Sequence, residues 1–319
     1  MSCIYKGQVI ESEVSGNANG GTEMMRARLL DNARHDLLKN VAIHFSRPRE
    51  MYDDVKNILY AHDLAEDPEM KILADNDFNG FDHFVFVTAW QRDQYITRYG
   101  IPYSMCTVIP NAIEKNYQPP AEDKDYETIR FIYHTTPHRG LELLVPIFDA
   151  LSNDYPNIRL DVYSSFSIYG WEQRDAPYEG LFNNIKGHPK MTYHGAVNNK
   201  EVLEALDKAH IFLYPNIWKE TSCLAMIEAI RSGVLCIHPN YGALTETAGN
   251  ATVSYDYTAD PRYHANFAYS VAKQVLENQK ADPSFLRKLT TSDRYALGKN
   301  SINSFTNSWN RLLRDMSDG

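Results

Sequence analysis

The sequence is short of the features that mark secreted, membrane-spanning and disulfide-rich proteins. Its four cysteines are widely spaced and form no CxxC pair, which argues against a disulfide framework or a zinc site and favours reduced thiols. No apolar run approaches the roughly 20 residues that span a bilayer. The N-terminus MSCIYKGQVIESE lacks the basic and then apolar layout of a signal peptide. We therefore expect a cytoplasmic protein without integral membrane association.

An excess of positive charge is also missing. The chain has 32 Lys and Arg against 41 Asp and Glu, so its formal net charge is -9. Both halves of the chain carry an acidic excess. Binding to a phosphate backbone relies on clustered Lys and Arg, so nucleic acid is disfavoured as a partner.

Buried-strand patterns alternate with helical patterns along the chain, which is typical of an α/β protein with parallel sheets. At 319 residues there is room for two domains, and the proline- and charge-rich stretch QPPAEDKDYET has the composition of a linker. We predict two Rossmann-like βα domains facing each other across a cleft, at 1–115 and 116–293, with a C-terminal helix at 294–319 that packs back on the first domain. The predicted strands are 2–10, 41–45, 57–60, 83–90 and 129–133 onward, and the predicted helices include 23–38 and 91–99.

The segment Tyr214 to Thr247 is the most informative part of the chain. A buried strand ends in Pro215, a helix follows to about Arg231, and another buried strand comes after Gly233. Thr221 or Ser222 is the expected N-cap of this helix. Ligands in open parallel sheets bind at the carboxyl ends of the strands, so this helix start should face a ligand.

Two carboxylates, Glu220 and Glu228, flank the predicted helix start. Residues eight apart lie about 80° apart around an ideal helix, so they should contact an elongated ligand at different points rather than form one dyad. The amides of Ser222, Cys223 and Leu224 would offer an anion site between them. The alternative is that both glutamates are ordinary helix-charge and surface residues.

Several segments together resemble one known family, the retaining family 4 glycosyltransferases of the GT-B fold. The resemblance rests on YPNIWKETSCLAMIEAIRSGVLCIHPNYGALTET with its E-x7-E spacing, NGGTE at 19–23, ILYAHDLAEDP, FVFVTAWQRDQYITRYGIP with VIPNAI, and YHTTPHRGLELLV. These segments occur in the order of the family and cover most of residues 1 to 250.

The resemblance implies roles for individual residues. Glu228 would hold the ribose hydroxyls of a nucleotide sugar and Glu220 the hydroxyls of the sugar, while the amides around Thr221, Ser222, Cys223 and Leu224 meet the diphosphate. Arg139 stands where the family has a phosphate-binding Lys, whereas the position of the family's second cation falls within His134 to Thr136. His134, His138 or another basic residue would have to supply that missing charge.

The N-terminal domain contributes further candidates by the same resemblance. Gly20 and Gly21 would let the backbone approach a phosphate or sugar, and His62 would lie beside the transferred sugar. Asp63 could orient the His62 ring. His134, Thr135, Tyr163 and Ser164 are weaker candidates, the last two bordering the nucleotide base. Each of these residues also has a plain structural explanation as a turn, loop or surface residue.

The reaction implied is transfer of a sugar from a nucleotide-diphosphate donor to a hydroxyl acceptor with retention of anomeric configuration. His62, Glu220 and Arg139 would be its catalytic residues. No metal and no cofactor beyond the donor is expected. The acidic N-terminal half disfavours a lipid acceptor and favours a glycan, a protein or a small molecule. A nucleotide-sugar epimerase of the same fold, a phosphorylase and a non-catalytic nucleotide-sugar-binding protein are the alternatives, although no pyridoxal-lysine motif supports the phosphorylase.

Overall fold

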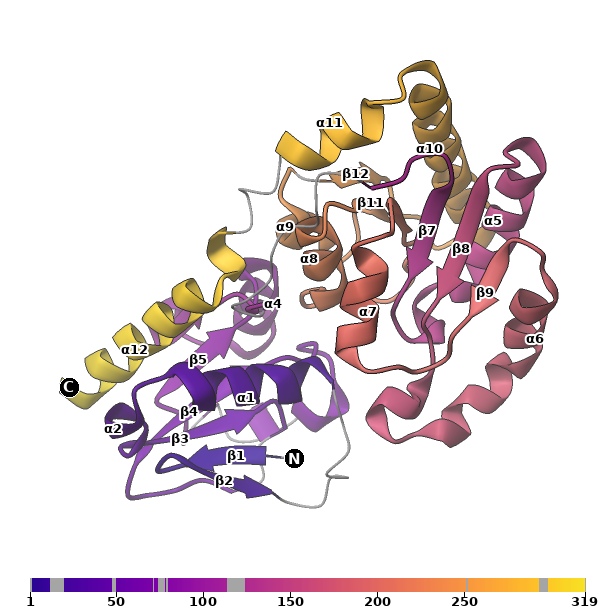
Figure 1. The fold of residues 1–319 in the computed structure, drawn as a ribbon. Helices are drawn as coiled ribbons and strands as arrows, with labels where there is room; N and C mark the ends of the chain where they lie inside the picture. The colour runs from indigo at the N-terminus through magenta and orange to yellow at the C-terminus, as the bar shows by residue number, and fades with distance from the viewer. Residues whose placement is uncertain are drawn as a thin grey trace. The chain divides into compact units, whose positions relative to one another are not determined.

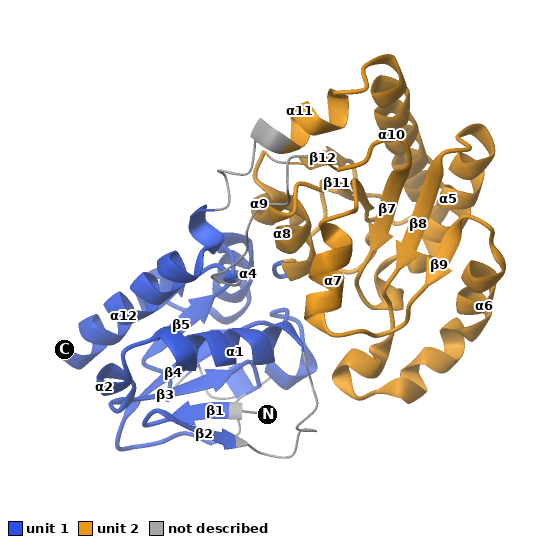
Figure 2. Cartoon of the chain, viewed as in Figure 1, with its two compact units in different colours: residues 1–116, 220–222, 298–319 blue, residues 117–219, 223–297 orange. Residues whose placement is uncertain are grey.

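The computed structural model divides the chain into two compact units (Figure 2). Unit 1 comprises Met1–Asn116, Glu220–Ser222 and Gly298–Gly319, and unit 2 comprises Tyr117–Lys219 and Cys223–Leu297. The residues described are 2–11, 20–47, 50–70, 72–73, 78, 80–113, 124–250, 252–292 and 298–318. Asn19, in the expected glycine loop, and residues 118–123 of the expected linker lie outside them.

Unit 1 is built on a six-stranded sheet of order β2-β1-β3-β4-β5-β6. Strands β3 to β6 are parallel, whereas β1 is antiparallel to both β2 and β3. The single strand predicted over 2–10 is therefore wrong: Lys6 and Gly7, with φ of 51° and 79°, turn the chain back into a hairpin. The strands are β1 (Ser2–Tyr5), β2 (Gln8–Glu11), β3 (Val41–Phe45), β4 (Lys56–Ala61), β5 (His83–Phe86) and β6 (Cys106–Val108).

The helices of unit 1 include one from the far end of the chain. Helix α12 packs against α1 and α2, and its start is tied by the bond from Ile113 N to Asn300 O (2.9 Å). The predicted strand over 83–90 ends early, because the Thr88 hydroxyl accepts from Gln91 N and caps α4. The helices are α1 (Gly21–Asn32), α2 (His35–Leu38), α4 (Ala89–Tyr99) and α12 (Ile302–Asp318), with 3-10 turns η1 (Pro68–Met70) and η2 (Tyr103–Met105).

Unit 2 is an all-parallel six-stranded sheet of order β12-β11-β10-β7-β8-β9 (Figure 1). The chain winds from β7 to β9 in one direction and then returns to β10, next to β7. The order thus reverses between β7 and β10, which is the topological switch point where such sheets bind ligands. The strands are β7 (Ile129–Tyr133), β8 (Ile158–Val162), β9 (Met191–Tyr193), β10 (Ile211–Leu213), β11 (Leu235–Pro239) and β12 (Thr252–Tyr255).

Helices cover both faces of this sheet, with α7, α8 and α9 on one face and α5, α6 and α10 on the other (Figure 1). The helices are α5 (Leu141–Asp154), α6 (Glu179–Gly187), α7 (Asn199–Leu206), α8 (Leu224–Arg231), α9 (Leu244–Ala248), α10 (Pro261–Ala281) and α11 (Phe285–Ser292). Three 3-10 turns complete the unit, η3 (Pro137–Arg139), η4 (Phe166–Tyr169) and η5 (Glu172–Tyr178).

The side chain of Lys124 forms hydrogen bonds with main-chain carbonyls at the C-terminal ends of α7 and α8. The Lys124 ammonium donates to the carbonyls of Ala209 (2.6 Å) and Ser232 (2.8 Å), and lies 3.3 Å from those of Leu206 and Gly233. These carbonyls follow α7 and α8, where a helix leaves its last acceptors unsatisfied and favours a positive charge. Lys124 is the first described residue of unit 2. It therefore bonds the start of this unit to the ends of both helices.

Two kinds of feature are absent from the described part of the chain. Among the described helices, none combines the length and the apolar composition of a membrane span. Within the same residues, no three His, Cys, Asp or Glu side chains are grouped so that they could hold a metal ion.

Candidate functional site

At the switch point of unit 2 the backbone leaves no room for a side chain at Gly140. Gly140 has φ of +117°, and a Cβ added to it would lie 2.1 Å from the carbonyl oxygen of Pro215. The turn after β7 therefore touches the loop after β10. Arg139 directly precedes this contact at the end of η3, so the residue lies at the carboxyl edge of the sheet, at the switch point.

Helix α8 begins later than the sequence indicated. It starts at Leu224 with Cys223 as its N-cap, and no side chain caps it. The prediction that Thr221 or Ser222 caps the helix is thus wrong, because the Thr221 hydroxyl donates to His62 O (2.7 Å) instead. Cys223 and Leu224 lie at the helix start as expected, whereas Glu220, Thr221 and Ser222 belong to the preceding loop and are grouped with unit 1.

Glu228 lies one turn into α8 and is 7% exposed. Its Oε1 accepts a hydrogen bond from the Asn199 amide (3.1 Å), at the first residue of α7. Asn199 fixes the rotamer of the Glu228 carboxylate. A carboxylate held in one orientation is suited to binding a ligand hydroxyl. Sequence reasoning missed Asn199, although the Asn-Asn pair before an apolar helix was a readable cap signal.

His134 cannot supply the cation that the sequence left missing. Its Nε2 lies 3.0 Å from the Ala225 carbonyl, so this nitrogen carries the proton. Burial lowers the pKa of His134 to about 4, so the ring is neutral at neutral pH. The same holds for His138, whose pKa burial lowers to about 4 with smaller contributions from the charges of Arg139 and Arg174.

Arg174 is the positively charged residue that sequence reasoning missed. It lies in η5, where its guanidinium stands 4.3 Å from the centre of the Trp171 ring. The next residue, Asp175, accepts hydrogen bonds from Phe166 N (2.8 Å) and the Ser165 hydroxyl, and the Phe166 ring stacks on His138 at 5.1 Å. These contacts hold η5 beside the turn that carries Arg139. No motif in the sequence indicated this approach.

The weaker candidates of unit 2 differ in whether their side chains already have partners within the protein. The Thr135 hydroxyl bonds within its own turn, 3.3 Å from the Tyr133 hydroxyl. The Tyr163 ring stacks on His194 at 4.2 Å and lines an open groove of about 560 Å³, and burial raises its pKa to about 12. Ser164 is 2% exposed, and its hydroxyl has no hydrogen-bond partner among the described residues. Such a buried unpaired hydroxyl calls for an explanation, and a ligand is one.

In unit 1, His62 directly follows β4 at the carboxyl edge of the sheet. Burial lowers the pKa of His62 to about 3, although the nearby Tyr60 carbonyl opposes this effect. Both ring nitrogens are buried and have no hydrogen-bond partner among the described residues. An unpaired buried polar group costs about 1–3 kcal/mol, so the ring is suited to a bound hydrogen-bonding ligand.

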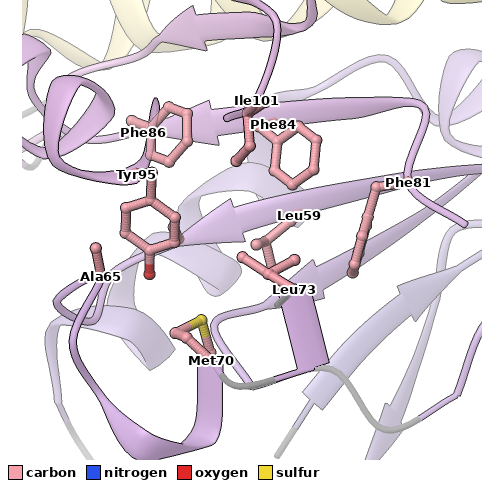
Figure 3. Packing of buried hydrophobic residues seen from close by; sticks show 10 residues of the cluster. Leu59, Ala65, Met70, Leu73, Phe81, Phe84, Phe86, Tyr95 and Ile101 are labelled. Atoms are coloured by element: carbon pink, nitrogen blue, oxygen red, sulfur yellow. The ribbon is translucent and has the colours of Figure 1, made fainter. Parts of the chain in front are cut away.

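The backbone after His62 is fixed by helix α4. Gln91 and Tyr95 donate to the Asp63 carbonyl at 2.8 and 3.2 Å, and the Tyr99 hydroxyl donates to the Ala65 carbonyl at 2.6 Å. Figure 3 shows Tyr95 within the apolar cluster of Leu59, Phe84 and Phe86 that anchors this helix on the sheet. The loop that carries His62 is therefore supported by the core of unit 1.

Asp63 does not orient the His62 ring, which corrects that expectation. Its Oδ2 accepts from Arg47 Nε at 3.0 Å, and the second branch of the guanidinium reaches Asp67 at 3.2 Å. Burial raises the pKa of Asp63, while the charge of Arg47 opposes the rise. The Asp63 carboxylate, which was expected to orient the His62 ring, is bonded to Arg47 instead.

The segment Glu220–Ser222 is bonded to this part of unit 1. Thr221 Oγ1 donates to His62 O, and the Thr88 hydroxyl donates to Thr221 O, each at 2.7 Å. Glu220 is 4% exposed. The two expected sugar-side residues, His62 and Glu220, are thus joined through Thr221.

Gly20 and Gly21 stand at the start of α1. Gly20 is the N-cap with φ of -77°, and Gly21 is the first helical residue. Neither position needs a left-handed backbone, and contact of a phosphate or sugar with this helix start stays a prediction.

A family model described as glycosyl transferases group 1 matches residues 112–285, which is more than half of the chain. A human relative, one of the proteins that make up phosphatidylinositol N-acetylglucosaminyltransferase, is 25% identical over 166 residues, or 51% of this chain and 33% of the relative. The Schizosaccharomyces pombe gpi3 subunit of that enzyme is 25% identical over 167 residues, or 51% of this chain and 35% of the relative. The chain thus matches about a third of the length of these relatives.

Solved structures share the fold at low identity. A glycosyltransferase from Rickettsia africae has a TM-score of 0.67 and 15% identity, with 96% of this chain and 84% of that chain covered. The Anabaena protein HepE, solved with UDP-glucose, has a TM-score of 0.63 and 11% identity, with 82% and 72% covered. The predicted fold class, two Rossmann-like α/β domains as in GT-B glycosyltransferases, is confirmed.

Proposed function

The chain belongs to the group 1 glycosyl transferases, and we propose that it moves a sugar from a nucleotide-diphosphate donor to a hydroxyl acceptor with retention of configuration. The proposal is supported above all by the switch point of unit 2. There the contact of Gly140 with Pro215 sets Arg139 at the carboxyl edge, while the Asn199 bond orients Glu228 on α8. A cation, a helix start and an oriented carboxylate are the groups that a diphosphate and a ribose require.

In this proposal the donor is bound mainly by unit 2. Arg139 binds the diphosphate in the bidentate way open to a guanidinium, and Arg174 provides the second positive charge. The amides that open α8 add the positive end of the helix dipole. Glu228, whose carboxylate is oriented by Asn199, accepts hydrogen bonds from the ribose hydroxyls.

The proposed chemistry breaks the bond between the anomeric carbon and the diphosphate oxygen. The acceptor hydroxyl attacks the same face of the sugar and forms the new glycosidic bond. A phosphate oxygen of the leaving diphosphate takes the acceptor proton, so the proton and the electron pair of the broken bond both leave with the nucleotide. Arg139 stabilises the charge that develops on that diphosphate. Glu220 and the neutral His62 hold the sugar hydroxyls.

The relatives suggest which substrates to test first. HepE was solved with UDP-glucose, and the human and yeast relatives are named for N-acetylglucosaminyl transfer, so uridine diphosphate sugars head the donor panel. For the acceptor we propose a hydroxyl of a glycan, a protein or a small molecule. Phosphatidylinositol belongs in the same panel because the relatives carry it in their names. We also propose that no metal takes part, so a chelator should leave turnover unchanged.

The deciding experiment incubates the protein with each donor and acceptor and follows released nucleotide and glycosylated product. Transfer with the anomeric configuration kept, read by proton NMR of the product, supports the proposal. An isomerised donor would instead identify an epimerase, and binding without turnover a nucleotide-sugar-binding protein. Transfer with inversion would contradict the retaining mechanism.

Replacing Glu228 tests the donor site directly. For Glu228→Gln we expect donor affinity to fall about 10- to 100-fold, because a charge-assisted hydrogen bond to the ribose is lost. Isothermal titration with uridine diphosphate measures this. The control is Glu277→Gln, an exposed glutamate of α10 that accepts from the Tyr155 hydroxyl just after α5. Equal affinities of the two variants would remove Glu228 from the site.

A further inference from the structure

The aromatic side chains behind His62 form a buried stack that ends on the C-terminal helix. The Tyr60 ring lies 4.2 Å from the His62 ring, and the Trp309 ring meets Tyr60 edge-on at 5.0 Å. Phe45 lies parallel to His62 at 6.3 Å. Tyr60 and Trp309 are both 0% exposed. All four residues belong to unit 1.

Trp309 reaches this stack because of the apolar stripe of α12. Ile302, Phe305, Trp309, Leu312 and Leu313 are buried at helical spacing. The bond from Ile113 N to Asn300 O fixes the point where the helix starts, and α1 and α2 flank it. The position of the indole ring is thus determined by the packing of a whole helix on unit 1.

The polar side-chain atoms of this stack form no hydrogen bonds with other described residues. Among the described residues, the Tyr60 hydroxyl, the Trp309 indole nitrogen and both His62 nitrogens have no hydrogen-bond partner. Their polar groups therefore do not set the ring orientations, and aromatic packing does so instead. The His62 main chain is held separately, by its N–H to Ser46 Oγ (3.0 Å) and by the Thr221 bond to its carbonyl.

We propose that Trp309 is a positioning residue for His62, holding the Tyr60 ring against the imidazole and so directing its two free nitrogens at the substrate. The catalytic part of this inference rests on the proposed function. Trp309 itself touches no substrate. Its role is to keep the imidazole in one orientation and away from water on the Tyr60 side.

Two readouts separate this role from plain stabilisation. Burial keeps the pKa of His62 at about 3, so in the native protein its ring should not titrate between about pH 5.5 and 8. Loss of the indole would let the Tyr60 ring relax and admit water, and the His62 pKa should rise towards the ordinary value of about 6.5. The charged groups around the stack, namely Arg28 beside Tyr60 and the pair Asp63–Arg47, are unchanged by that substitution.

The experiment compares Trp309→Leu and Trp309→Phe in the full chain. Histidine NMR, with the His62 signal assigned by its loss in His62→Ala, follows the titration. For Trp309→Leu we expect the signal to titrate in this range and kcat to fall about 10- to 100-fold, with KM for the donor within about threefold. Trp309→Phe keeps a ring against Tyr60 and should retain the native titration and most of kcat.

The matched control is Leu38→Ala, which removes a fully buried side chain of unit 1 beside Gly7. It should lower the unfolding midpoint but leave the His62 titration unchanged. The inference is overturned if the His62 signal of Trp309→Leu does not titrate in this pH range. It is also overturned if Trp309→Phe shows the same titration and the same loss of kcat as the leucine variant. If no donor is turned over, the proposed function fails, and the NMR titration still decides whether Trp309 positions His62.

Discussion

At the scale of single residues, each unit has a buried histidine directly after a parallel strand, His62 in unit 1 and His134 in unit 2. Burial keeps His62 after β4 and His134 after β7 neutral at physiological pH. A neutral ring can bind hydroxyls but does not balance the charge of a diphosphate. The diphosphate site that we propose in unit 2 therefore relies on arginines, which stay protonated at any pH of interest.

Arg174 is the residue on which this charge balance is best tested. For Arg174→Ala we expect the affinity for uridine diphosphate to fall about 3- to 10-fold, and by less at high salt, because the side chain is exposed and its charge is screened. Isothermal titration at two salt concentrations measures this. Arg159→Ala serves as control, because that side chain donates to the Ile158 carbonyl at the start of β8, remote from the carboxyl edge. If Arg174→Ala bound as tightly as the control, Arg139 would act alone.

At the scale of elements, the sequence located helix α8 but misplaced its start. The apolar spacing from Leu224 to Ile230 and the closing Gly233 predict the helix body, and the structure has it at Leu224–Arg231. The start depends on Thr221, whose hydroxyl bonds to the His62 carbonyl 159 residues away. Local cap rules cannot anticipate a partner at that distance. For the same reason Asp63 was assigned to its neighbour His62 rather than to Arg47.

The contact of Gly140 with the loop after β10 gives a prediction at this scale. Gly140→Ala would force a Cβ to within 2.1 Å of Pro215 O at a φ of +117°. We expect the free energy of unfolding to fall by at least about 2 kcal/mol, and nucleotide binding to weaken as Arg139 moves. Urea unfolding measures the first effect. Gly180→Ala, in helix α6 with no atom within 4 Å of the added Cβ, should instead be neutral or stabilising by up to about 1 kcal/mol.

At the scale of the whole molecule, the alternation of strands and helices was sufficient to predict two parallel-sheet units, and the fold is confirmed. The hairpin at the N-terminus was missed because a two-residue turn at Lys6 and Gly7 interrupts an otherwise continuous β pattern. The residues proposed to bind donor and sugar remain predictions from sequence. What the sequence could not reveal are contacts between distant segments, such as Trp309 on Tyr60 and Asn199 on Glu228.

Buried histidines give the molecule a predictable response to acid. Burial lowers the pKa of His134, His210 and His238 to about 4 each. Between that value and the unfolded value of about 6.5, the unfolded chain binds more protons than the folded protein. Stability should therefore fall as the pH drops from about 6.5 to about 4, by up to about 3 kcal/mol for each ring.

Thermal unfolding across this pH range checks the sign and the size of the effect. His238→Asn should flatten the slope, because this ring is 0% exposed. His35→Asn, at an exposed position of α2, should leave it unchanged. A midpoint that rose on acidification would contradict the assignment of these rings as buried and neutral.

Lys124 also determines where unit 2 can be cut from the rest of the chain. A fragment that started at Ile129, where β7 begins, would contain every strand of the second sheet but would lose the ammonium that bonds the carbonyls after α7 and α8. Those two helices carry Asn199 and Glu228. A truncation that respects the strands alone should therefore loosen the Asn199–Glu228 pair, which we propose binds ribose, whereas one that begins before Lys124 keeps it. The boundary of a stable unit 2 thus precedes its first strand.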